Sequence, residues 1–502
     1  MHAVASRAGD EEEVVVHGHI VIGSGVFGSS TALALSRLGH SVTVLDRSAS
    51  GYCAPDAASN DLNKIVRADY KDEHYARLAK MAIELWRRDD GLSQCYHEVG
   101  LLLHSGESNP HGEAYVKRGL STALKDAHRE EGPSSSSQRA DRSSATLESG
   151  KTTGSIGTSM PAPLPRLAYE LTSDEQTSSV FPADLELGVG LKGIGKTQQA
   201  YINPRAGWAE AQKATNIVLD QAKELGVRVL SNANVVELLH DDQFRFYGAR
   251  LQDGRIVRTS DRSAHVICCV GSWSTKFLRS ALPQKIQRPP STSSAQCVLL
   301  LRVENAQLRR RMKDIPVVIN FDTGFYAFEP NEEGLLKCAI HGEGYAYPEP
   351  PCAPQSSYPN FAQGQSGAGA DDSPSSSERR ASNTFVPADK QEKMLEELYG
   401  LYPELADQGN AQVVESRICW YSDSVDEEWL IDHVPGTRGL VVCCADSGHA
   451  FKFLPLLGSL VTSRMQLTDK PLTPHQSKVW SFAHHLQAAA AHRTELNIRG
   501  QI

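Results

Sequence analysis

No run of apolar residues in the sequence approaches the roughly 18–20 residues that a membrane span needs. The first residues, MHAVASRAGDEEEVVVHG, also lack the apolar stretch of a secretory signal. The last four, RGQI, do not form a peroxisomal Ser-Lys-Leu signal. We therefore expect a cytoplasmic protein that does not associate with membranes, with a peroxisomal location as the alternative.

The sequence also has no excess of basic over acidic residues. The 502 residues contain 51 Lys and Arg against 60 Asp and Glu, so the chain lacks the electrostatic footprint of a nucleic-acid-binding protein. The ten cysteines show no CxxC spacing, which argues against a disulfide framework or a metal site. Hydrophobic residues at 40% and charged residues at 22% are ordinary for a soluble globular chain, and the length predicts two or three domains.

Three segments contain few large apolar residues and are rich in polar or small ones: 1–13, 131–162 and 350–385. Such compositions cannot bury enough surface to offset the chain entropy lost on folding, so we expect these segments to be disordered. The second and third are interpreted as surface insertions within one fold.

Between these segments, strand and helix patterns alternate. HIVIGSG predicts a strand, Ser30 to Leu38 a helix and SVTVLD a second strand, which together form a βαβ unit. AEAQKATNIVLDQAKELG predicts a long amphipathic helix, followed by a strand at VRVL. HVICCVGS and GLVVCCADSG are apolar strands that run into Gly-rich turns, and a helix is expected from about His449 to Arg464.

These repeated strand-turn-helix units predict an α/β protein with one parallel sheet assembled from discontinuous segments. We expect a nucleotide-binding domain and an inserted substrate domain. The first is assigned to 14–105, 198–280 and 405–480. The second is assigned to 106–197 and 281–404.

The sequence Gly23-Ser24-Gly25-Val26-Phe27-Gly28 follows a strand and opens a helix. Its glycines allow a tight turn, approach of a pyrophosphate to the backbone, and close packing of helix on strand. Asp46 ends the next strand, where a carboxylate can bind a ribose hydroxyl. An adenine dinucleotide is predicted, and the motif alone does not separate FAD from NAD.

The Gly-rich start, the VICCVGSWS segment and the later DSGHAFKF segment together resemble the D-amino-acid oxidase superfamily. Within it, the chain resembles the monomeric sarcosine oxidase and fructosyl amino acid oxidase (amadoriase) family, and is most similar to fungal-type sarcosine, pipecolate and saccharopine oxidases. The resemblance covers most of residues 18–480. It implies an FAD-binding Rossmann-like domain, an α+β substrate domain with a large mixed or antiparallel sheet, and a monomer.

Cys419 lies in the sequence RICWY, where family members carry a cysteine that forms a thioether to the flavin. The resemblance therefore implies covalent FAD. The SGHAFKF turn contains Gly448, which implies close approach of the backbone to the flavin, and Lys452, which implies binding of the substrate carboxylate.

NDLNKIVR resembles the loop under the flavin. Arg67 falls where sarcosine oxidases place a carboxylate-binding arginine, and a guanidinium offers a carboxylate two parallel donors. Lys64 takes the position of a second arginine near the flavin. The residues expected to contact the cofactor are Gly23, Gly25, Val26, Phe27, Gly28, Asp46, Arg47, Asn63, Lys64, Val236, Gly271, Trp273, Cys419, Gly448, His449, Phe451 and Lys452.

Tyr326, Lys337 and His341 reproduce a sarcosine oxidase spacing, with the Tyr eleven residues before the Lys and the His four after it. The family's lysine speeds electron transfer to oxygen, because a fixed positive charge stabilises superoxide as it forms. Tyr421, two residues after Cys419, matches the same pattern. Amadoriases carry a Glu at the position of His341. The histidine in this chain therefore favours an amino acid over a glycated substrate.

The predicted function is an FAD-dependent oxidase that converts the C–N bond of a secondary amino acid to an imine and produces hydrogen peroxide. The expected catalytic residues are Lys337, Arg67, Lys452, His341, Tyr326 and Tyr421. A fructosyl amino acid oxidase and an amine oxidase of secondary metabolism are the alternatives within the family. An NAD-dependent dehydrogenase would not explain the late CWY and SGHAFKF segments. A non-catalytic flavin-binding protein would be expected to lack the residues placed around the flavin, yet Lys337, Arg67, Lys452 and Cys419 are all present.

Overall fold

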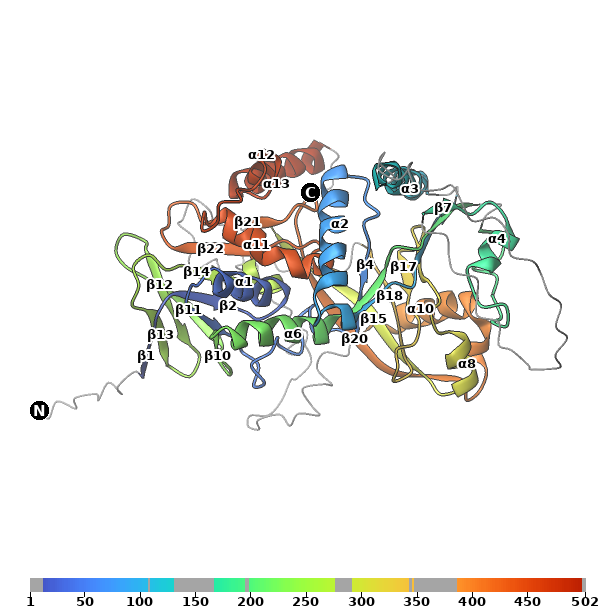
Figure 1. The fold of residues 1–502 in the computed structure, drawn as a ribbon, viewed down its shortest axis with the longest axis horizontal. Coiled ribbons are helices and arrows are strands. Elements are labelled where there is room, and N and C mark those ends of the chain that lie inside the picture. Colours follow the sequence, from blue (N-terminus) through green and yellow to red (C-terminus); the bar gives the residue numbers. More distant parts are fainter. Residues whose placement is uncertain are drawn as a thin grey trace, which may run out of the picture.

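The computed structural model describes residues 12–106, 109–130, 167–194, 198–275, 291–342, 345–346 and 386–498. The segments 131–162 and 350–385, which were expected to be disordered, lie outside the described residues. So do residues 1–11, whereas Glu13 opens strand β1 (Glu13–Val16). Figure 1 shows two sheet-containing regions placed end to end, one around α1 and the other around α10.

The first region is built on a six-stranded sheet in which five neighbouring strands are parallel. Its four central strands are buried along their whole length and mostly apolar, as expected for a parallel sheet that is covered on both faces. The predicted parallel sheet from discontinuous segments is thus confirmed. The strand order is β10 (Arg228–Leu230), β3 (Val42–Leu45), β2 (His19–Ile22), β14 (Val266–Cys268), β22 (Leu440–Cys444) and antiparallel β21 (Leu430–His433).

Three helices pack together beside this sheet: α1 (Val26–Arg37), α6 (Ala211–Glu224) and α11 (Leu454–Arg464). Helix α1 begins earlier than predicted, directly after the extended residue Gly25. Helix α11 begins later than the expected His449, because a 3₁₀ helix, η5 (Phe451–Phe453), comes first and Pro455 then stands in the first turn of α11. Proline is tolerated there because the first helical N–H groups have no partner within the helix.

The second region contains a nine-stranded mixed sheet, as the resemblance implied. Strands β6, β8 and β20 come from segments assigned to the nucleotide domain, so both sets of segments contribute to this sheet. The order is β19 (Tyr345–Ala346), β15 (Thr292–Val303), β18 (Leu335–Ile340), β17 (Phe325–Ala327), β16 (Val317–Asn320), β6 (Leu101–Gly106), β8 (Gln198–Asn203) and β7 (Tyr169–Glu170), with β20 (Ala411–Asp423) paired to β15.

Helix α10 (Ala388–Leu401) packs on this sheet, and α8 (Ala306–Arg311) and α3 (Pro110–Glu130) lie at its sides (Figure 1). A small sheet lies between the two regions and consists of β4 (Asn63–Val66), β9 (Gly207–Glu210) and β5 (Tyr96–His97). Helix α2 (Glu73–Arg88) stands beside it.

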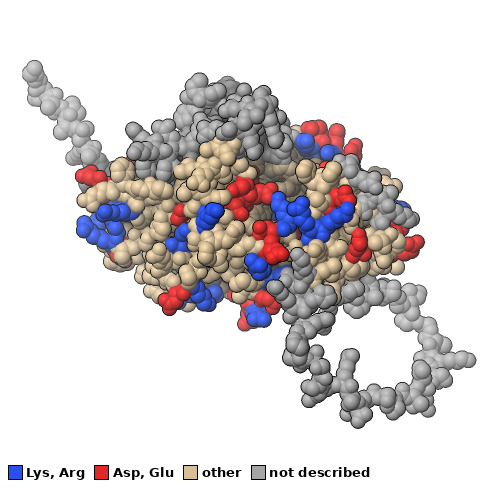
Figure 2. All heavy atoms as spheres, turned by 90° about the horizontal axis from the view of Figure 1, so that it is seen from above, with Lys and Arg blue, Asp and Glu red and all other residues tan. Residues whose placement is uncertain are grey.

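A further sheet of β1, β13 (Ile256–Thr259), β12 (Phe246–Leu251) and β11 (Val235–His240) packs at the outer end of the first region. Among the described helices, none combines the length and apolar character that a membrane crossing requires. Figure 2 shows acidic and basic side chains interspersed on the face seen from above. The carboxyl ends of the parallel strands meet at one edge of their sheet, and this edge is where such folds bind ligands.

We predict that Gly458→Ala destabilises the fold at the contact between α1 and α11. An added Cβ at Gly458 would lie 1.9 Å from the Ser30 carbonyl oxygen. The Ser30 hydroxyl also donates to the Leu454 carbonyl at 2.6 Å and accepts from the Gly458 N–H at 2.7 Å, so the helices cannot separate without loss of these bonds. Overpacking should lower the free energy of unfolding by about 1–3 kcal/mol, measured by denaturant titration.

Gly400→Ala is the matched control for this substitution. Gly400 lies in α10, and an added Cβ there meets no atom within 4 Å. Replacement of a helical glycine should leave stability unchanged or raise it by up to about 1 kcal/mol. Equal effects of the two substitutions would contradict the contact described for Gly458.

Candidate functional site

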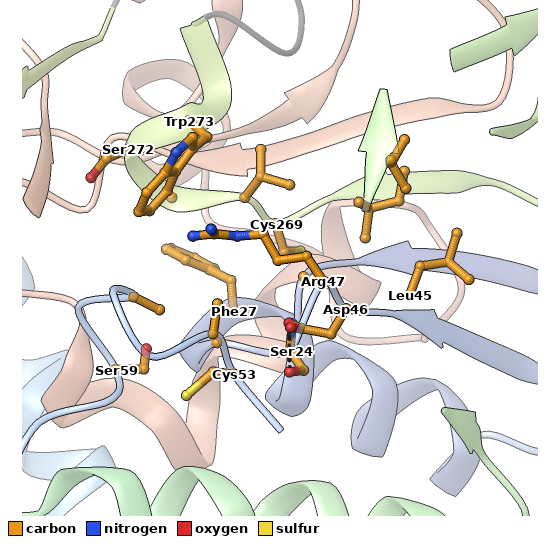
Figure 3. Close-up of a pocket in the computed structure, with 18 of the residues that line it drawn as sticks. Ser24, Phe27, Leu45, Asp46, Arg47, Cys53, Ser59, Cys269, Ser272 and Trp273 are labelled. Carbon is orange, nitrogen blue, oxygen red and sulfur yellow. Dashed lines mark hydrogen bonds between the residues drawn. The ribbon is translucent and has the colours of Figure 1, made fainter. Parts of the chain in front are cut away.

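A cavity of about 520 Å³ opens at the carboxyl edge of the parallel sheet (Figure 3). It lies between the turn after β2, the end of β3 and the segments that follow β14 and β22. Nine of the expected cofactor residues line it: Gly23, Gly25, Val26, Phe27, Asp46, Arg47, Val236, Gly271 and Trp273.

The Gly-rich turn is shaped by contacts that exclude larger side chains. Gly23 has a φ of +91°, and a Cβ there would lie 2.5 Å from the Cys269 carbonyl oxygen. A Cβ on Gly28 would lie 1.8 Å from the carbonyl oxygen of Gly23. The Val26 N–H donates to the Ser59 hydroxyl at 2.9 Å. The turn therefore presents bare backbone at the start of α1, which suits a phosphate.

Asp46 is buried at the end of β3. One carboxylate oxygen accepts from the N–H and the hydroxyl of Ser24, both at 2.8 Å, and the other accepts from the Ser48 N–H at 2.9 Å. The Arg47 guanidinium lies 4.6 Å from the centre of the Trp273 ring, and Figure 3 shows the two side chains together above the turn. These contacts hold the carboxylate of Asp46 and the ring of Trp273 at the wall of the same cavity.

Asn63 lies at the start of β4 and is fully buried. Neither its side-chain nitrogen nor its side-chain oxygen has a hydrogen-bond partner in the described part of the chain. An unsatisfied buried polar group costs about 1–3 kcal/mol, so such groups in native proteins usually serve a ligand. The glycine turn, the carboxylate of Asp46 and this free amide together fit a bound dinucleotide such as FAD.

Asp61 lies at the centre of a buried group of cations that the sequence did not single out. One carboxylate oxygen accepts from Lys337 Nζ and from Lys64 Nζ, each at 2.6 Å, and the other is 3.8 Å from Arg417 Nη1. Lys337 Nζ also donates to the Asn63 carbonyl at 2.7 Å. The side chains of Asp61 and Lys337 have no exposed surface. The signal available in the sequence was an acid three residues before Lys64 in NDLNKI.

The charges in this group are strongly coupled. Burial alone would raise the pKa of Asp61, but attraction by Lys337, Lys64 and Arg417 outweighs it and holds that pKa far below its usual value. Burial lowers the pKa of Lys337 to about 8, although Asp61 opposes this effect. Burial also disfavours the charged form of Lys64, but attraction by Asp61 dominates and raises the pKa of Lys64.

Cys419 is buried beside this group, with its Sγ 3.4 Å from Lys64 Nζ. Two residues further along β20, Tyr421 is hydrogen-bonded to Tyr326, which lies on β17. The ring centres of Tyr421 and His341 are 5.7 Å apart. The mixed sheet thus brings Cys419, Tyr421, Tyr326 and His341 to the same place as Lys337.

A second cationic group contains Lys452 and Arg67. Lys452 Nζ donates to the Tyr70 hydroxyl at 2.8 Å and to the His449 carbonyl at 2.7 Å. Arg67 donates to the Asp69 carbonyl and, at 3.0 Å, to the Tyr115 hydroxyl. Both cations lie near the Tyr70 ring, at 5.2 Å for Lys452 and 5.3 Å for Arg67.

Neither cation of this second group forms an ion pair with a carboxylate among the described residues, although Asp446 attracts Lys452. The nearby Asp69 carboxylate is occupied by the Tyr201 hydroxyl at 2.8 Å and by the Asn203 amide. Burial and then repulsion by Arg67 hold the pKa of Lys452 well below its usual value. Burial likewise lowers the pKa of His341, and repulsion by Arg67 and Lys452 acts in the same direction. An anion would relieve the repulsion.

The remaining expected cofactor residues lie outside the lining of the cavity: Gly28, Asn63, Lys64, Cys419, Gly448, His449, Phe451 and Lys452. Gly448 has a φ of +68°, and a Cβ there would lie 2.3 Å from the Tyr421 ring, so this glycine makes room for the tyrosine. Phe451 packs near Trp86, with ring centres 5.9 Å apart. Trp420 and Asp446, which neighbour Cys419 and the SGHAFKF turn, do line the cavity.

Relatives with known names cover nearly the whole chain. L-saccharopine oxidase from Schizosaccharomyces pombe is 27% identical, over 89% of this chain and 89% of that protein. Peroxisomal sarcosine oxidase from Homo sapiens is 22% identical, over 88% and 90%. The crystal structure of fructosamine oxidase (amadoriase II) from Aspergillus fumigatus shares the fold, with a TM-score of 0.65, 22% identity and coverage of 94% and 90%.

The family model described as FAD dependent oxidoreductase matches residues 19–464. This range includes the Gly-rich turn, the Asp61 group and the SGHAFKF turn. The resemblance expected from these motifs is confirmed, and FAD is the cofactor. The chain belongs to the FAD dependent oxidoreductase family.

Proposed function

We propose that the chain is an FAD-dependent oxidase of secondary amino acids, either N-alkylated or cyclic, such as sarcosine, L-pipecolate or L-saccharopine. The reaction converts the C–N bond to an imine and reduces oxygen to hydrogen peroxide. When bound, FAD supplies the hydride acceptor and passes the electrons to oxygen. The names of the saccharopine oxidase and sarcosine oxidase relatives support this substrate class.

The observation that carries the proposal is the pair of neighbouring cations Arg67 and Lys452, which form no ion pair with an acid among the described residues. Two like charges in a buried site repel, and a substrate carboxylate between them compensates both. Arg67 supplies parallel N–H donors that match a carboxylate, and Tyr70 holds Lys452 beside it. A bound carboxylate also favours the charged form of Lys452, whose pKa is low without one.

The amine end of the substrate then faces Tyr326, Tyr421 and His341. Burial lowers the pKa of His341, which favours its uncharged form, and an uncharged imidazole nitrogen can accept a proton from a bound ammonium. An uncharged amine has the lone pair that helps to expel the α-hydride. The imine hydrolyses in water after release.

Lys337 and Cys419 are assigned roles toward the cofactor. Lys337 holds a positive charge against Asp61 and is the proposed site that assists electron transfer to oxygen. Cys419 is the proposed point of covalent attachment, and its sulfur accepts from Lys64 Nζ at 3.4 Å.

A deglycating fructosyl amino acid oxidase is the second candidate. It is supported by the NDLNKI loop and by the fold shared with fructosamine oxidase. His341 stands against it, because amadoriases carry a Glu at this position.

Peroxide formation with a panel of substrates tests the proposed function. We expect turnover of sarcosine, L-pipecolate or L-saccharopine and little with fructosyl-valine. The amide of the preferred substrate should react at least about 30-fold more slowly in kcat/KM, which corresponds to the roughly 2 kcal/mol lower limit for loss of a buried charge pair. Preference for fructosyl-valine would establish the second candidate instead.

Arg67→Met is expected to remove the preference for the acid over the amide. Activity on the acid should fall at least about 30-fold, whereas activity on the amide should change little. Arg228→Met, at an exposed position on β10, is the control and should leave both values unchanged. Equal losses on acid and amide in the Arg67 variant would contradict a carboxylate clamp.

Cys419→Ser tests covalent attachment. After precipitation with acid, the wild-type pellet should stay yellow, because a thioether survives unfolding. The variant should release its flavin into the supernatant. Release of flavin from both proteins would show that no such bond forms.

Lys337→Met is expected to slow flavin reoxidation by oxygen by about 10²-fold or more, with little effect on flavin reduction by substrate. Asp61 keeps Lys64 and Arg417 as partners in this variant, so the site remains compensated. A lysine is charged below its pKa, so wild-type reoxidation should fall as the pH rises through about 8, and the variant should lack this step. Stopped-flow absorbance measures both half-reactions, and equal slowing of the two would refute the assignment.

A further inference from the structure

The turn that follows β22 is strained. Ala445, Ser447 and Gly448 have φ angles of +57°, +46° and +68°. For Ala445 and Ser447 the left-handed region costs about 1–2 kcal/mol each. Such strain persists only where neighbouring contacts impose it, and it is frequent at functional sites.

The end of β20 imposes this conformation. The Ser422 hydroxyl accepts from the Ala445 N–H at 3.1 Å, and the Ser422 carbonyl accepts from the Ser447 N–H at 2.9 Å. The Ser424 N–H donates to the Ser447 hydroxyl at 3.1 Å. The turn is therefore tied on both sides of Asp446, and this residue is held in one orientation.

Asp446 lines the same cavity as the Gly-rich turn. Its Oδ1 accepts a long hydrogen bond of 3.3 Å from the Ser422 N–H. The carboxyl group also accepts from its own backbone N–H, and it forms no ion pair in the described part of the chain. A strained turn thus places an acid held only by backbone N–H groups on the lining of the cofactor cavity.

We propose that Asp446 contacts the bound FAD and that its protonation state tunes the cofactor. None of the sequence motifs assigned a role to Asp446. The proposal depends on FAD in the cavity and not on the identity of the amine substrate.

The electrostatics of the site support such a role. Burial raises the pKa of Asp446 to about 7, with a further contribution from Asp423 on β20. The Ser422 N–H and Lys64 on β4 act in the opposite direction. Lys452 in η5 and the Cys444 thiol on β22 also interact with this carboxyl group.

Below about pH 7 the neutral acid can donate a hydrogen bond to the cofactor, and above it the carboxylate can only accept. The ionised form also adds a negative charge to the cavity, which disfavours negative charge on reduced FAD. The balance between oxidised and reduced cofactor should therefore change with the charge on Asp446.

Asp446→Asn is the direct test, because the amide keeps the shape and removes the titration. The absorption spectrum of substrate-free, FAD-loaded protein is followed from pH 5.5 to pH 9. We expect a transition near pH 7 in the wild type and its loss in the variant. The midpoint potential should likewise show an added pH dependence around 7 in the wild type alone.

Two further variants separate Asp446 from its neighbours. Lys337→Met should keep the transition near pH 7, since Lys337 itself titrates near 8. Asp423→Asn removes a repelling charge and should move the transition to lower pH. This variant also decides the matter if Asp446→Asn does not fold, because an unmoved transition would overturn the proposal.

A wild-type spectrum that is constant between pH 6 and 8, or a transition retained in Asp446→Asn, would also overturn it. These outcomes differ from failure of the proposed function. An oxidase of another substrate would still be yellow and still titrate, whereas a colourless protein would remove the cofactor on which both proposals rest.

Discussion

Asp61 holds Lys337, Lys64 and Arg417 together inside the protein, and the rest of the candidate site depends on this contact. Three cations buried without an anion would repel one another and lose their hydration, a cost of several kcal/mol for each ion. The carboxylate compensates them through bonds of 2.6 Å to both lysines. Because Lys337 lies on β18 and Lys64 on β4, the same contact joins the mixed sheet to the small sheet between the two regions.

The two cationic groups differ in one respect that separates their roles. The group around Asp61 is compensated within the protein, so it keeps its charge whether or not a substrate is present. The pair of Arg67 and Lys452 forms no ion pair with an acid among the described residues, and its positive charge is suited to an anionic ligand. The proposed roles, electron transfer for the first group and carboxylate binding for the second, make use of this difference.

The conformation of the SGHAFKF turn follows from packing on β20. Gly448 leaves space for the Tyr421 ring, and Ser422 fixes the backbone around Ala445 and Ser447. One strand therefore carries Cys419 and Tyr421 and also orients the turn that presents Asp446 to the cavity. A change in β20 is therefore expected to affect both the cofactor cavity and the turn that carries Lys452.

Sequence alone determined the features that depend on local order along the chain. The glycine spacing from Gly23 to Gly28 and the apolar runs of the parallel strands predicted the sheet, the turn and the dinucleotide, because backbone freedom and strand burial leave direct traces in neighbouring residues. The resemblance added Cys419, Lys337, Arg67 and Lys452 as candidates. It did not reveal what holds each one in place.

Only the tertiary structure decided those partners. Asp61 meets Lys337 from 276 residues away, and Tyr70 meets Lys452 from 382 residues away. No periodicity links such residues, since their contacts depend on how separate sheets pack. The same reason accounts for the cavity position of Asp446. Pairing of charges across a fold is a property of three-dimensional packing, which a local pattern does not encode.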